Sequence, residues 1–169
     1  MNYHNITKDD MKNGDGLRVV LWLSGCENHC KDCQNPQTWD YESGIPFDEK
    51  ALEEIEAELR KDYVAGITFS GGDPFAPKNR EDVGYIIRYL QHEYPTKTIW
   101  VYTGYKYEQL LFEGNFDVLS ALSLTDVLVD GKYIKELRDV KLKWRGSKNQ
   151  RVIDVQKSLN SGKAVLHCD

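Results

Sequence analysis

The chain has 169 residues, of which 40% are hydrophobic and 29% charged, and its formal net charge at pH 7 is -5. These values are typical of one globular domain, and no apolar run approaches the roughly 20 residues of a membrane-spanning helix. The acidic balance leaves no dominant basic stripe, so we expect neither nucleic acid nor a membrane as a partner. The most basic stretch, Lys132 to Arg151, is interrupted by acids and is interpreted as a solvated face.

The first residues, Met1 to Ile6, lack the basic and then apolar pattern of a signal peptide. We therefore expect a cytoplasmic protein. Thiols stay reduced in that compartment, so the four cysteines indicate metal binding or catalysis more than disulfides.

The predicted elements begin after a polar segment, residues 1–16, whose end Asn13-Gly14-Asp15-Gly16 is typical of a turn. Leu17–Leu23 is nearly all apolar and predicts a strand buried on both faces. Asp48–Asp62 predicts a helix that Asp48 caps. The pattern then predicts, in order, a strand at 66–69, a helix at 80–94, a strand at 98–102, weaker helices at 107–113 and 116–122, and strands at 125–129, 151–155 and 164–166.

This alternation of strands and helices predicts a single α/β domain over residues 1–169 with a mostly parallel sheet. Ligands of such sheets bind at the carboxyl ends of the strands. Four of the predicted strands are followed by loops rich in cysteine, glycine or polar residues, and we expect these loops on one rim of the sheet. They are a cysteine loop, Ser70–Pro74, Thr103–Tyr105 and Asp130-Gly131.

The cysteine loop follows the first predicted strand and has the spacing C-x3-C-x2-C, formed by Cys26, Cys30 and Cys33. Three thiolates hold a metal centre and leave one coordination position open for chemistry. A structural zinc knot would need a fourth ligand, and His29, next to Cys30, is awkwardly placed to be one. An iron–sulfur cluster is favoured; a zinc knot, a disulfide site and unrelated thiols stay open as alternatives. Cys168 has no companion nearby and is interpreted as a free thiol.

The same spacing in the same place resembles the signature of radical S-adenosylmethionine (SAM) enzymes. The resemblance implies that Cys26, Cys30 and Cys33 hold three irons of a [4Fe–4S] cluster and that SAM chelates the fourth iron. It also implies that Asp32 and Gln34 lie beside the cofactor. The remaining residues of the loop are expected to be replaceable, namely Glu27, Asn28 and Lys31.

The segment Ser70-Gly71-Gly72-Asp73-Pro74 is a tight turn or a ligand loop. It resembles the Gly-Gly-Glu motif of the same enzymes, with Asp73 where Glu is commoner. The resemblance implies that the backbone of Gly71, Gly72 and Pro74 and the carboxylate of Asp73 bind the SAM amino group, because a carboxylate complements an ammonium.

Two further groups keep more than one interpretation. Asp130 is a turn residue or a contact of SAM or of an active-site cation. A polar set near the predicted rim binds SAM, receives a partner's peptide or is solvated: Arg145, Ser147, Asn149 and Gln150.

Several more motifs resemble the activating proteins of the anaerobic (class III) ribonucleoside-triphosphate reductase, over about residues 1–155. These motifs are Asn13-Gly14-Asp15-Gly16-x-Arg18, Asn35-Pro36-x-Thr38-Trp39, Trp100–Tyr105, Asp126–Gly131 and Trp144–Gln150. The family usually has Pro where this chain has Asp15. Residues 156–169 are interpreted as a C-terminal extension.

The resemblance implies reductive cleavage of SAM to methionine and a 5′-deoxyadenosyl radical, which generates a glycyl radical on the large reductase subunit. It implies a flavodoxin- or ferredoxin-like electron donor. The alternatives are activation of another glycyl-radical enzyme, such as pyruvate formate-lyase, and a non-catalytic zinc-binding module. The implied fold is an open, partial (β/α) barrel, because 169 residues cannot supply eight units at the typical size of about 250.

Overall fold

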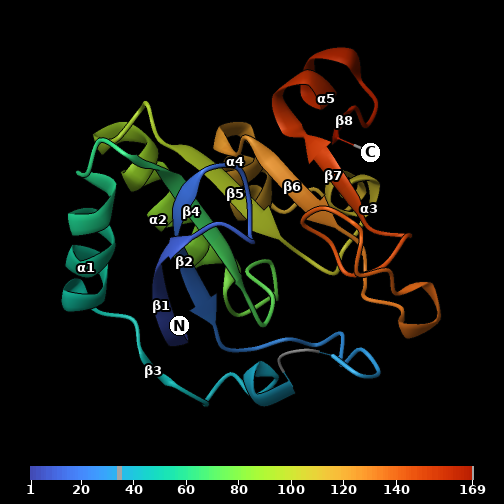
Figure 1. The fold of residues 1–169 in the computed structure, drawn as a ribbon, viewed down its shortest axis with the longest axis horizontal. Helices are drawn as coiled ribbons and strands as arrows, with labels where there is room; N and C mark the ends of the chain where they lie inside the picture. Colours follow the sequence, from blue (N-terminus) through green and yellow to red (C-terminus); the bar gives the residue numbers. More distant parts are fainter. Residues whose placement is uncertain (34–35, 169) are drawn as a thin grey trace.

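The computed structural model describes residues 1–33 and 36–168. Its strands form one sheet in the order β3-β1-β2-β4-β5-β6-β7-β8, with β3 and β8 at the edges (Figure 1). The strands are β1 (Asn2–Asp10), β2 (Leu17–Leu23), β3 (Ile45–Pro46), β4 (Val64–Gly71), β5 (Thr98–Tyr102), β6 (Val127–Asp130), β7 (Arg151–Asp154) and β8 (Leu166–Cys168).

The four central strands β2, β4, β5 and β6 are parallel. Antiparallel strands flank them on both sides, β1 and β3 on one and β7 and β8 on the other. The predicted α/β class with a parallel centre is confirmed. The loops that follow the four parallel strands lie toward the bottom and right of Figure 1, at one end of the sheet.

The helices fall between the central strands and after β7. They are α1 (Glu49–Leu59), α2 (Arg80–Glu93), α3 (Tyr107–Glu113), α4 (Phe116–Leu124) and α5 (Val155–Ser161), with short 3-10 turns at η1 (Pro36–Thr38) and η2 (Lys135–Leu137). Asp48 caps α1 as predicted, because its carboxylate accepts a hydrogen bond from the Ala51 amide at 2.9 Å. No helix in the described ranges is long and apolar enough to cross a membrane.

The two faces of the sheet differ, because successive side chains of a strand point to opposite sides. On one side, Ile67 and Phe69 of β4 join the main apolar core with buried residues of all five helices. On the other, Trp100, Val129 and Val152 form a smaller apolar cluster. The functional loops lie over this second face.

Arg18 of β2 anchors the N-terminal turn over the second face and is fully buried. Its guanidinium donates to Thr68 Oγ1, Thr98 Oγ1 and three backbone carbonyls, at 2.7–3.0 Å. It lies 5.5 Å from the centroid of the Trp100 ring. Burial lowers the pKa of Arg18 to about 10, so the side chain is still a cation at neutral pH.

Several predicted bounds were wrong. The strand predicted at 164–166 is β8 at Leu166–Cys168, and the strand predicted at 66–69 is longer, at Val64–Gly71. Residues 1–16 contain the nine-residue strand β1, which pairs with β2 although its sequence is polar. The strand predicted from Thr125 begins at Val127 instead. The Thr125 amide bonds to the Leu122 carbonyl and ends α4, and the Asp126 carboxylate accepts from the Ile99 amide.

Candidate metal centre

The loops after β2, β4, β5 and β6 line one cavity of about 450 Å³. A volume of this size is within the range of small-molecule sites. The predicted rim is confirmed, since the lining includes the three clustered cysteines, Gly71 to Asp73, Thr103, Gly104 and Gly131. Strand residues of the second face, such as Trp22, Tyr102 and Val129, form the floor.

The backbone of the cysteine loop is held from outside. Gly25 and Cys26 donate their amides to the carbonyls of Thr38 and Trp39, at 2.6 and 3.1 Å. The His29 ring stacks on Trp39 with centroids 4.6 Å apart and an interplanar angle of 14°. The loop therefore enters the cavity in one fixed direction before it reaches Cys30. The His29 ring is thus engaged in packing against Trp39.

All three thiols of the loop line the cavity and are half-buried. Burial raises the pKa values of Cys26 and Cys30. At Cys30 a backbone hydrogen bond from Tyr133 opposes the rise, and at Cys26 the amide groups of Asn28 and His29 do the same. Metal binding would deprotonate these thiols, because the thiolate is the ligand.

Asp73 joins the loops through its carboxylate, which is 1% exposed. Oδ1 accepts from the Phe75 amide and the Thr103 hydroxyl, and Oδ2 accepts from the Gly104 amide, all at 2.8–2.9 Å. Oδ2 also accepts from Asn28 Nδ2 at 2.9 Å. Burial raises the pKa of Asp73, and these four hydrogen bonds oppose that rise. The carboxylate holds three loops together.

Asn28 is a cavity-lining residue that the sequence analysis missed. Its amide nitrogen lies 2.9 Å from Asp73 Oδ2 and 3.6 Å from Cys26 Sγ, so one NH2 group bridges the carboxylate and a predicted cluster ligand. The Asn28 side chain also fills the space that a Cβ on Gly104 would occupy, at 2.2 Å. Asn28 was expected to be replaceable, and these contacts argue against that expectation. Only its position between two cysteines could have drawn attention to it.

The last residue of β4, Gly71, and the next residue, Gly72, are needed for close packing. A Cβ on Gly72 would lie 2.5 Å from the Gly25 carbonyl oxygen, immediately before Cys26. A Cβ on Gly71, whose φ is +98°, would lie 2.4 Å from the Leu23 amide nitrogen. The glycines thus let this loop contact the cysteine loop directly.

Other predicted cofactor residues lie outside the cavity lining. Asp130 is 1% exposed and accepts from the Tyr107 amide and from Arg151, so it orders α3 and β7. The exposed Asp32 forms an ion pair with Lys135 at 3.1 Å. Pro74 is buried beneath the rim. Gln34 lies outside the described residues.

Two buried N–H groups among the cavity-lining residues have no hydrogen-bond partner in the described structure, Trp39 Nε1 and Arg145 Nε. Arg145 is otherwise fixed, because Nη1 donates to the Gln150 carbonyl at 2.6 Å. Buried donors are nearly always paired, so these two mark a place for an acceptor on a ligand. The other members of this polar set bond among themselves, since Ser147 Oγ donates to Asn149 Oδ1 at 2.6 Å.

The comparisons with known proteins address this centre directly. Residues 12–153 match the protein-family model of the 4Fe-4S single cluster domain. The chain is 41% identical over 152 residues to the anaerobic ribonucleoside-triphosphate reductase-activating protein of Enterobacteria phage T4, covering 90% of this chain and 93% of that protein. The chain belongs to this family.

Two bacterial relatives of the same family agree. The activating protein of Escherichia coli K12 is 41% identical over 154 residues, covering 90% of this chain and 97% of that protein. That of Haemophilus influenzae is 40% identical over 152 residues, covering 89% and 96%. The region that matches the 4Fe-4S domain includes Cys26, Cys30 and Cys33.

The residues present fit such a cluster. Three thiols from one loop share a cavity with two unpartnered donors. Within residues 1–33 and 36–168, no three His, Cys, Asp or Glu side chains converge enough to hold a single metal ion. A four-iron cluster binds each thiolate at a separate iron atom, so its ligands need not converge on one point.

Proposed function

We propose that the chain activates the anaerobic ribonucleoside-triphosphate reductase by generating a glycyl radical on its large subunit. The observation that carries the proposal is the cavity itself, where three cysteine thiols, a Gly-Gly loop and two unpartnered donors face one small-molecule space. The names of the relatives support the target.

Cys26, Cys30 and Cys33 would hold the [4Fe–4S] cluster, and the rest of the cavity would hold SAM. When bound and reduced, the cluster supplies the electron that cleaves SAM to methionine and a 5′-deoxyadenosyl radical, which abstracts hydrogen from a glycine Cα. The chain's own residues bind, orient and shield these groups.

Arg145 is the proposed anchor of the methionyl carboxylate. Its unpartnered Nε–H and its positive charge complement an anionic oxygen, and Trp39 Nε1 offers a second donor. Asp73 is a less direct anchor of the SAM ammonium, together with the Gly71 and Gly72 backbone. Both Asp73 oxygens already accept two hydrogen bonds, so a direct ammonium contact would displace a donor.

The open face of the sheet would admit the reductase segment. We propose that the second face, over which the cavity lies, is the inner face of an open partial barrel. A closed barrel has eight parallel strands, whereas only β2, β4, β5 and β6 are parallel here and β3 and β8 stay at the edges, so the unclosed sheet would leave room at the side for a protein loop.

Anaerobic reconstitution tests the proposal. We expect a brown protein with about four irons per chain, and methionine and 5′-deoxyadenosine after reduction with SAM. Addition of the reductase large subunit should give the EPR doublet of a glycyl radical, whereas pyruvate formate-lyase should give none. A colourless protein that binds one zinc ion and does not cleave SAM would overturn the proposal.

A further inference from the structure

The segment of residues 131–150, here called the basic loop, reverses the charge of the molecule locally. It contains seven Lys or Arg residues and two acids, in a chain whose formal net charge is -5. The remaining residues are therefore strongly acidic. A local field of opposite sign attracts partners that the rest of the surface repels.

The basic loop connects β6 to β7 and lies against the cysteine loop. Its inner residues Tyr133, Trp144 and Arg145 line the cavity. The Tyr133 backbone bonds to Cys30, and Lys135 pairs with Asp32, next to Cys33. The blue cysteine loop and the orange basic loop lie side by side at the right of Figure 1.

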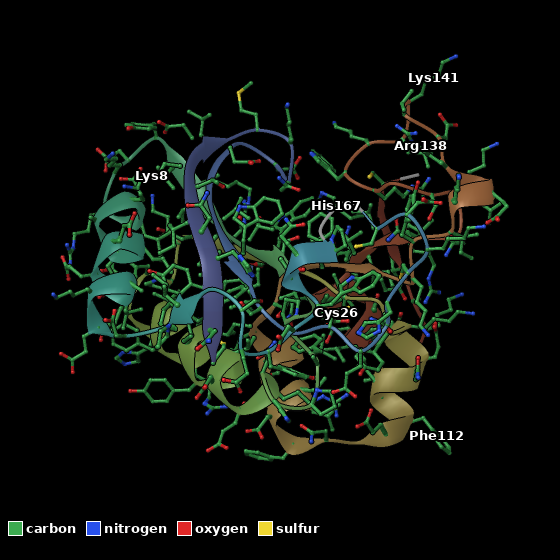
Figure 2. All side chains as sticks on the ribbon, turned by 90° about the horizontal axis from the view of Figure 1, so that it is seen from below. Lys8, Cys26, Phe112, Arg138, Lys141 and His167 are labelled. Carbon is green, nitrogen blue, oxygen red and sulfur yellow. The ribbon has the colours of Figure 1, made fainter. Side chains whose placement is uncertain are left out.

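The outer side of the loop presents cations to solvent. Four exposed basic side chains outside the cavity lining form no ion pair with any described residue: Arg138, Lys141, Lys143 and Lys148. Lys132 is also exposed and unpaired in the described structure, at the mouth of the cavity. Figure 2 shows Arg138 and Lys141 on the part of the loop that projects farthest from Cys26. The expected solvated face is thus a cationic rim beside the metal centre.

The acids around the metal centre do not neutralise this rim. Asp32 forms an ion pair with Lys135, and Arg151 forms ion pairs with both Asp130 and Glu108. Glu27 accepts a hydrogen bond from the Tyr41 hydroxyl. That contact involves no cation, and Asp73 beside Cys26 forms no ion pair with any described residue. Asp73 is 1% exposed, however, and is held by four hydrogen bonds, so it does not offset the rim at the surface.

The chemistry of the rim favours a transient protein partner. Lysine is depleted at the centre of tight interfaces, where aromatic residues dominate. A lysine-rich surface instead raises the association rate with an acidic partner while adding little affinity. Brief, electrostatically steered encounters of this kind are typical of electron-transfer proteins.

We propose that the basic loop is the docking surface for an acidic flavoprotein that delivers electrons to the cluster; this inference rests on the proposed function. The anionic flavin hydroquinone of the donor gives up one electron and becomes the neutral semiquinone, with no proton transferred. The cluster held by Cys26, Cys30 and Cys33 takes up the electron and changes from 2+ to 1+.

The experiment compares two double variants with equal charge change. Arg138→Glu with Lys141→Glu reverses the tip of the basic loop, outside the cavity lining. Lys50→Glu with Lys163→Glu reverses two exposed side chains in other parts of the chain. Stopped-flow absorbance follows cluster reduction by a flavodoxin hydroquinone at low and high salt. Calorimetry measures flavodoxin binding to the cluster-free proteins.

We expect the loop variant to be reduced by flavodoxin about tenfold or more slowly at low salt, with the difference vanishing at high salt. Its flavodoxin binding should weaken in parallel, while the control variant behaves as the parent protein. Photoreduction with deazaflavin, iron content and SAM cleavage should be equal in all three proteins. That photoreduction arm fails in every protein if the proposed function itself is wrong.

Equal flavodoxin rates and binding in the two variants would overturn the docking proposal. Slower reduction by deazaflavin as well would also overturn it, because the substitutions would then have damaged the cluster. Loss of reductase binding with intact flavodoxin reduction would assign the basic loop to the reductase instead.

Discussion

At the scale of single residues, Asn28 is the most informative member of the cysteine loop. The spacing of the cysteines identifies them as candidate ligands from the sequence alone. The role of Asn28 depends on its hydrogen bond to Asp73, which is 45 positions away in sequence. Sequence reasoning cannot see such a contact, because it depends on how tightly the loops after β2 and β4 pack. Gly72 permits that packing by having no Cβ.

Asn28→Ala should lower the free energy of unfolding by about 1–3 kcal/mol, because it leaves a buried carboxylate with one donor fewer. Urea denaturation of the cluster-free protein measures this loss. The substitution should also shift the cluster's midpoint potential, since hydrogen bonds to the ligand sulfurs set that potential. Lys31→Ala, in the same loop but exposed, is the control. Identical unfolding and potentials in the two variants would contradict the role given to Asn28.

The buried hydrogen-bond network of Arg18 gives a second prediction at this scale. Arg18→Met should destabilise the protein by about 2–4 kcal/mol, because it strands several buried acceptors, among them the Ile67 and Thr98 carbonyls. Urea denaturation is again the measurement. Arg60→Met removes only an exposed ion pair with Glu53 and should cost less than about 1 kcal/mol. Equal losses would show that the Arg18 network contributes nothing.

At the scale of elements, the sequence predicted the centre of the fold better than its edges. The bounds of β2, β5 and α3 agree with the pattern of apolar residues, because each packs into the main core. β1 is polar and forms because β2 offers an edge to pair with, and the very short β3 then pairs with β1. Only tertiary pairing defines such strands, so local pattern does not reveal them.

The loop after β4 gives a steric prediction. Gly72→Ala should reduce iron incorporation severalfold, because the new methyl group meets the Gly25 carbonyl and displaces the backbone before Cys26. Iron and sulfide analysis after reconstitution measures the effect. A Cβ added at Gly114 would meet no atom within 4 Å, so Gly114→Ala adds only the backbone strain of a φ of +68°. This variant should keep full iron content. Normal iron content in the Gly72 variant would refute the close approach of the two loops.

The last strand gives a prediction for residues 156–169. β8 pairs with β7, and His167 lies 5.4 Å from the Trp100 ring centroid and 2.8 Å from Asp15. Truncation after Ser161 should therefore expose Trp100 and lower Tm by several degrees. Iron content should be unchanged, because these residues lie outside the cavity lining. Calorimetry and iron analysis test both parts, and an unchanged Tm would show that the segment is dispensable for stability.

At the scale of the whole molecule, one parallel sheet explains why residues far apart in sequence serve one site. Most of the loops that line the cavity follow parallel strands, and such loops meet at the same end of the sheet; the turn after the antiparallel β1 adds Lys12 and Asn13. The sequence predicted this convergence from alternation alone. Most basic side chains of the segment after β6 are exposed, as expected, but sequence alone does not show that this loop folds back onto the cysteines.

The distribution of charge over the whole molecule affects how partners approach it. An acidic body with a cationic rim beside the cysteine loop would favour encounters at the metal centre. The fold thus supplies both a site for the cofactors and a direction of approach.

The most direct test of the account is the EPR spectrum of the reductase large subunit after anaerobic incubation with this protein, SAM and a reductant. We predict a glycyl-radical doublet with the parent protein and none with Cys26→Ala, Cys30→Ala or Cys33→Ala, each of which removes a proposed cluster ligand. A doublet that persists in these variants, or no doublet from a fully iron-loaded parent protein, would contradict the account.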